Sequence, residues 1–184
     1  MIKIKACFKF TVLLFTSYCT QAQCEVFKSE ITDVQKYMIQ VNQLTDSLST
    51  AAETASYNAS FSTARKNTKT VMLLMGQAVN AADEAVILAS DAQYDSEKCG
   101  LEEAMSYTID AERNAIDARD FASEAYENVK SASKSPNLGN LQFHMRKAQR
   151  LLREVRNAAE ASAYAADNAH YSCSHSIDHA SLDK

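Results

Sequence analysis

The residue types best suited to chemistry gather near the C-terminus of this 184-residue chain. His170, Cys173, His175 and His179 fall within ten residues and include three of the four histidines. Imidazole nitrogen and thiolate sulfur are good ligands for Zn, Cu and Ni ions. The spacing matches no established metal site, so a polar tail is the competing interpretation. We keep a metal-binding or metal-delivery protein as the alternative functional hypothesis.

Three cysteines, Cys24, Cys99 and Cys173, form a second candidate set. Cys7 and Cys19 lie in the N-terminal segment that we expect to be removed. Three is an odd number, so one thiol remains after an intramolecular disulfide forms, or pairs with another chain. The sequence leaves the pairing open.

Catalytic and cofactor motifs are absent from the sequence. It contains no haem-attachment Cys-x-x-Cys-His, no G-x-S-x-G, no P-loop and no dinucleotide fingerprint. Di-iron bundles use Glu-x-x-His on two helices, and that pair does not occur here. We therefore predict a protein that is not an enzyme and has no cofactor beyond the metal alternative.

Residues 1–22 are typical of a secretory signal peptide. A positive region with three lysines precedes the short apolar run Phe10–Phe15, and Ala22 ends a suitable cleavage site. The run is shorter than the roughly 20 residues of a membrane-spanning helix. A membrane anchor or a buried N-terminal helix is the alternative. We expect cleavage after residue 22 and a periplasmic or extracellular location, where disulfides are permitted.

The charge of the mature chain disfavours nucleic-acid binding. Removing three lysines from 19 basic residues leaves 16 against 23 acidic ones, a formal charge of −7. Such a charge favours solubility and weakens nonspecific attraction to phosphate backbones. We expect a protein partner or self-association, no nucleic acid, and no membrane span in the mature chain.

Four segments position the candidate residues, and each has small or apolar residues alternately three and four apart. These seams run over Phe27–Ala55, Ala64–Ala92, Leu101–Ala132 and Leu141–Cys173. This repeat keeps one helix face against a partner helix. The chain has only 3 Gly and 1 Pro, and Ala is abundant, which favours helices over loops and strands. We therefore predict an all-α fold of long, Ala-rich, coiled-coil-like helices.

The breaks between the segments differ in strength. Ser135–Gly139 is a strong turn because it contains proline, and residues 95–100 form a moderate one. The first break, near residues 57–60, rests on a two-residue shift of the seam, and a stutter in one continuous helix is the alternative. The expected helices span about 25–57, 61–94, 100–134 and 138–172. They form a bundle over 23–173, followed by a polar tail over 174–184.

Nearly equal helices with short links predict an up-down-up-down antiparallel four-helix bundle. This topology places Cys24, Cys99 and Cys173 at the same end. It also sets an acidic block of the third helix beside a basic block of the fourth, which favours their antiparallel pairing. The blocks comprise Asp117, Asp120, Glu124 and Glu127 on one side and Arg146, Lys147, Arg150, Arg153 and Arg156 on the other.

The functional expectation is an exported, non-enzymatic bundle with a structural or protein-interaction role. The alternative is the metal-binding protein that uses the C-terminal His/Cys cluster. A membrane-active protein is a third possibility, because Val71–Met75 is a strong apolar run. Its register with the second seam favours a place in the core instead.

Overall fold

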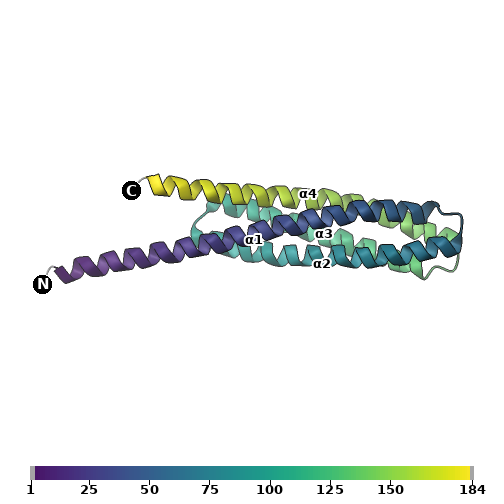
Figure 1. The fold of residues 1–184 in the computed structure, drawn as a ribbon, viewed down its shortest axis with the longest axis horizontal. Coiled ribbons are helices and arrows are strands. Elements are labelled where there is room, and N and C mark those ends of the chain that lie inside the picture. The colour runs from purple at the N-terminus through teal and green to yellow at the C-terminus, as the bar shows by residue number, and fades with distance from the viewer. Residues whose placement is uncertain (1–2, 183–184) are drawn as a thin grey trace.

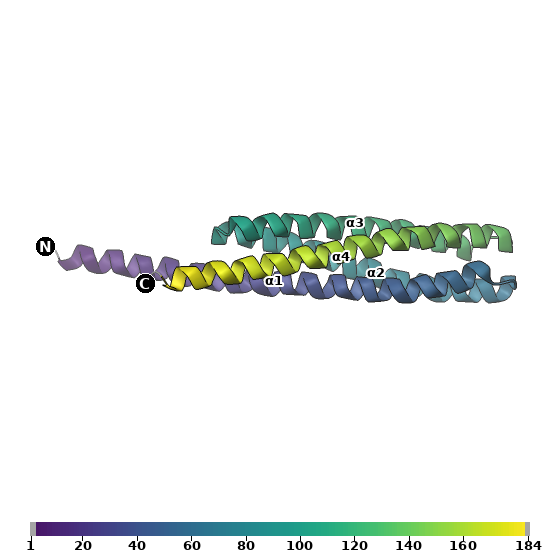
Figure 2. The ribbon, with the colours of Figure 1, turned by 90° about the horizontal axis from the view of Figure 1, so that it is seen from above.

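The computed structural model describes the backbone of residues 3–182 and the side chains of residues 23–175. Its helices are α1 (Lys3–Tyr57), α2 (Phe61–Cys99), α3 (Glu102–Ser133) and α4 (Leu138–Leu182). They run alternately up and down (Figure 1), so the predicted antiparallel four-helix bundle is confirmed. α1 and α3 each pack along α2 and α4. In Figure 2, α3 lies above and α1 below, α4 lies nearest the viewer, and α2 lies behind it, on the opposite side of the bundle.

The three connections are short, and side chains or glycine end the helices. Between α1 and α2, the Asn58 side chain accepts a hydrogen bond from the Ser60 N–H (2.8 Å), and Ser60 caps α2. Gly100 ends α2 in a left-handed conformation with φ 67°, which suits a residue without a side chain. Asn137 accepts a hydrogen bond from the Asn140 N–H (2.9 Å) as α4 begins.

The core follows the predicted seams and consists largely of alanine. Every seam residue of α1, α2 and α4 is buried. At the start of α3 the predicted seam is wrong: Leu101 and Met105 are only partly buried, and Ala104 lies in the core instead. Buried hydroxyls are satisfied by carbonyls: Thr68 donates to Ala64 within its helix, and Ser162 donates to Ala111 across the α3–α4 contact (2.8 Å). Small side chains allow close approach of the backbones, but each buries little apolar area.

The helices are less equal than the sequence suggested. α2 continues to Cys99 because residues 95–99 contain no helix breaker, and Gly100 ends it. α4 continues to Leu182, over most of the segment 174–184 that the sequence assigned to a polar tail. No Gly or Pro follows Gly139, so nothing in the sequence stops the helix earlier. The backbone of α1 begins at Lys3 and extends past the other helices (Figure 1).

Candidate functional site

Cys24, Cys99 and Cys173 lie together at the end of the bundle where α1 enters, α2 ends and α4 leaves. Cys24 and Cys173 are buried, Cys99 is partly buried, and all three are thiols in the structure. A side-chain hydrogen bond joins Cys99 to Cys24. The up-down topology thus brings three positions far apart in sequence into one thiol cluster, with Cys24 and Cys99 in direct contact.

The surroundings of the thiol cluster keep Cys99 and Cys173 protonated. Burial, with the hydrogen bond to Cys24 and nearby thiol and carboxylate charge, raises the pKa of Cys99 to about 12. Burial raises the pKa of Cys173 to about 11, although Lys28 acts in the opposite direction. Nucleophilic and metal-binding cysteines react as thiolates, so this environment suits a structural role better than catalysis.

The C-terminal histidines do not converge with Cys173. His170 and His175 are exposed, whereas the Cys173 side chain points into the core. The Tyr171 hydroxyl is 2.9 Å from His175 Nε2, and the two rings lie against each other. Among the side chains described, no group of three or more His, Cys, Asp or Glu residues is arranged to hold a metal. His179 lies outside the described side chains, so the metal hypothesis remains a prediction.

One carboxyl group near the thiol cluster is perturbed. Burial, then the negative charges of Asp95 and Asp91 on α2, raise the pKa of Glu30 to about 7. Its Oε2 atom is buried and has no hydrogen-bond partner. Desolvation and like charge both favour the protonated form, so Glu30 is a titratable group in the physiological pH range that the sequence did not reveal.

The predicted charge blocks of α3 and α4 meet through one direct ion pair, Lys147–Glu124 (3.2 Å). Arg156 turns instead to Asp46 on α1. Arg146 and Arg150 line a shallow surface groove of about 450 Å³ beside Phe143. The opposed blocks favour antiparallel pairing without forming a continuous network of ion pairs.

Two outer helix faces carry exposed apolar and aromatic residues. Residues seven apart form a ridge on the side of each helix that faces away from the core. The α2 ridge consists of Lys66, Leu73, Asn80, Ile87 and Tyr94, and the α4 ridge of Phe143, Arg150, Asn157, Tyr164 and Tyr171. The six apolar or aromatic side chains among them are 55–70% exposed. The two helices that carry these ridges, α2 and α4, lie on opposite sides of the bundle (Figure 2).

The equivalent faces of α1 and α3 are polar. The matching positions are Ser29, Lys36, Gln43 and Thr50 on α1, before its terminal Tyr57, and Ser106, Arg113, Asp120 and Glu127 on α3. No large exposed hydrophobic residue occurs on α3 within the described side chains. The exposed apolar side chains of α1 (Val26, Ile39 and Tyr57) do not share one such ridge, whereas those of α2 and of α4 recur at multiples of seven residues. This alignment in rows distinguishes α2 and α4 from surfaces with scattered exposure.

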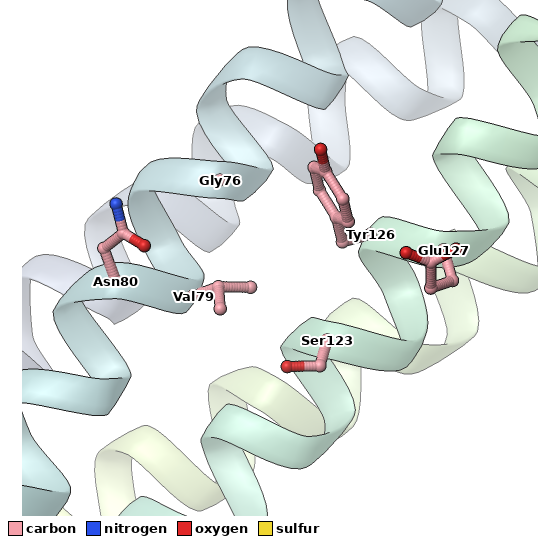
Figure 3. A pocket seen from close by; sticks show the side chains of 6 residues that line it. All are labelled: Gly76, Val79, Asn80, Ser123, Tyr126 and Glu127. Carbon is pink, nitrogen blue, oxygen red and sulfur yellow. The ribbon is translucent and has the colours of Figure 1, made fainter.

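Shallow grooves flank the α2 ridge on both sides. The groove toward α3 has a volume of about 370 Å³, and Figure 3 shows Val79 pointing across it toward the wall with Ser123 and Tyr126. Gly76 borders this groove, and a Cβ atom added there would meet no atom within 4 Å. The groove toward α1, about 380 Å³, is lined by Asn80 as well. The centre of the ridge thus stands between two depressions.

α2 has more apolar residues than its core contacts require. By length and composition alone, this helix could cross a membrane. Only 33% of its most apolar 18-residue window is buried in the bundle, so apolar residues remain on its outer face. The run Val71–Met75 is divided: Val71 and Met75 are in the core, as predicted, whereas Leu73 is 69% exposed. Leu73, Ile87 and Tyr94 recur at multiples of seven residues, a signal that the sequence carries beside the stronger pattern of the core seam.

Comparisons with protein-family models, with curated protein sequences and with solved structures find no match.

Proposed function

We propose that the protein is an exported, non-enzymatic interaction module that binds other protein surfaces through the outer faces of its bundle. The observation that carries the proposal is the pair of exposed ridges on α2 and α4. Among the described side chains the core consists largely of small residues, and the pockets that they line are shallow surface grooves. Exposed apolar side chains gathered in rows typify protein contact surfaces.

Export is the second part of the proposal and rests on residues 1–22. Their positive, apolar and small-residue regions have the order of a secretory signal peptide. An oxidising compartment would also allow the adjacent Cys24 and Cys99 thiols to form a disulfide. The mass of the protein recovered from its native cells tests this part. A chain that begins after residue 22 supports export, and a chain that retains residues 1–22 overturns it.

Site-specific photocrosslinking in the native cells tests the interaction role. Benzoylphenylalanine is placed in turn at Leu73 on the α2 ridge, at Tyr164 on the α4 ridge and at Arg113 on the polar face of α3. All three side chains are exposed, so Arg113 is a matched control for random collision. We expect protein adducts from at least one ridge and not from Arg113. Equal labelling at all three positions would refute the interaction role.

A further inference from the structure

The charges around the α2 ridge reverse in sign along the helix, and Asn80 lies at the midpoint. Leu73 and Ile87 each lie seven residues from Asn80, on opposite sides. Lys69 lies 11 residues before Asn80 and Asp91 lies 11 residues after it, and both are exposed. A surface with this arrangement is complementary to itself when a second copy approaches in the opposite direction.

We propose that two copies of the chain associate through their α2 ridges, antiparallel, with a two-fold axis at Asn80. This inference deepens the interaction role and rests on it. Leu73 of each copy then packs against Ile87 of the other, and Lys69 faces Asp91 of the other. The two Asn80 amides meet at the axis, where a polar pair can fix register and orientation.

The residues beside the ridge fit this antiparallel arrangement. Glu84 of one copy faces Gly76 of the other, where the missing side chain leaves open space. Asp83 faces Gln77, so neither acid meets an acid across the axis. A parallel pair would set Asp83 and Glu84 against the same acids of the second copy. Like charges directly opposed are destabilising, so the antiparallel direction is favoured.

The α4 ridge is a poorer site for self-association. Its midpoint is Asn157, and Glu154 and Glu160 lie three residues on either side of it. An antiparallel contact about Asn157 therefore opposes Glu154 to Glu160 of the second copy. The α4 ridge also holds Arg150 where the α2 ridge holds Leu73. Its tyrosines suit a different protein surface.

A lipid bilayer is a poorer occupant of the α2 ridge than a second copy. Asn80, Asp83 and Glu84 lie at or beside its centre. Polar and charged groups in hydrocarbon are costly unless they find partners. In the antiparallel pair Asn80 meets an amide, and the two acids lie near the edge of the contact, where water reaches them.

Sedimentation equilibrium of the purified protein at micromolar concentrations tests the proposal, with circular dichroism to confirm that each variant is helical. We expect twice the mass of one chain. Leu73→Asn should raise the dimer Kd about 100-fold, since the two-fold axis makes each substitution act twice. Tyr164→Asn is the matched control on the α4 ridge and should leave the Kd unchanged.

Charge reversal tests the direction of the contact. Lys69→Glu and Asp91→Lys should each raise the Kd about 10-fold, and the double variant should restore it. A monomer at every concentration, or a dimer that Tyr164→Asn dissociates and Leu73→Asn does not, overturns the α2 contact. Failure of the double variant to restore the Kd overturns the antiparallel direction. If the protein is a monomer that binds phosphatidylglycerol vesicles, and if Leu73→Asn abolishes this binding, a membrane and not a second copy covers the α2 ridge, and the proposal of self-association is overturned. Crosslinks from Tyr164 to a different protein would leave the interaction role standing in each case.

Discussion

Glu30 should make the bundle less stable as the pH rises, and one substitution should remove the effect. Burial and the charges of Asp95 and Asp91 raise its pKa from an ordinary value of 4.5 to about 7. Between these values the folded state binds the proton more tightly than the unfolded chain does. Glu30 therefore makes its full contribution to the free energy of unfolding below pH 4.5. That contribution decreases as the pH rises to about 7.

The size of the effect follows from the pKa difference and from the partial exposure of the carboxyl. At about 1.4 kcal/mol per pH unit, the interval from 4.5 to about 7 gives an upper bound of about 3.5 kcal/mol. Solvent reaches part of the Glu30 side chain and screens the charges of its neighbours. We therefore expect the ionised carboxylate to cost on the order of 1 kcal/mol at pH 8.

Urea unfolding of the wild-type protein and of Glu30→Gln, at pH 4 and pH 8, measures this cost. Glutamine has the shape of the protonated acid and cannot ionise. The variant should be about 1 kcal/mol more stable than wild type at pH 8 and nearly equal to it at pH 4. Glu53→Gln removes the same charge from an exposed position of α1 and serves as the control. The reasoning fails if Glu30→Gln gains no more at pH 8 than at pH 4, or if Glu53→Gln gains as much.

Three further substitutions probe the core and the thiol cluster. Ser162→Ala removes the hydrogen bond from its hydroxyl to the Ala111 carbonyl and should lower the free energy of unfolding by about 1 kcal/mol in urea titration. Ala118→Leu should cost about 1–3 kcal/mol in the same assay, because Ala118 is fully buried and inserting a larger side chain into a packed core forces its neighbours to shift. Diamide, which accepts two electrons and two protons, should convert the mature protein to a Cys24–Cys99 disulfide, identified by peptide mass mapping. Cys99→Ser should abolish that product, whereas Cys173→Ser should leave it.

The bundle could be predicted from the sequence because its core seam is a local pattern. Helical periodicity places Val71, Met75 and Ala78 on one face whatever their tertiary partners are, and all three are buried. The first break was predicted only from the shift of the seam. In the structure, the Asn58 and Ser60 side chains accept backbone hydrogen bonds at this break. Both residue types favour turns and helix starts, so they are local sequence signals for the break.

The electrostatic and thiol features could be predicted only in part. Topology alone placed the three cysteines at one end, but not the direct hydrogen bond between Cys24 and Cys99. The raised pKa of Glu30 depends first on burial and then on two carboxylates from another helix, 61 and 65 residues away in sequence. Sequence spacing within one helix carries no information on such neighbours. The separation of His170 from Cys173, by contrast, follows from the predicted seam, which includes Cys173 and not His170.

The alanine core and the exposed ridges are connected through the amount of apolar surface that the fold can bury. Alanine side chains bring the backbones close together, but each removes little area from water. The larger apolar residues Leu73 and Ile87 lie outside the core, where a single bundle gains nothing from their burial. An antiparallel contact between α2 ridges would bury them, and by mass action it would stabilise the folded chain as well as join two copies. Assembly and folding stability would then depend on the same residues, so the α2 ridge would contribute to the fold as much as to the contact.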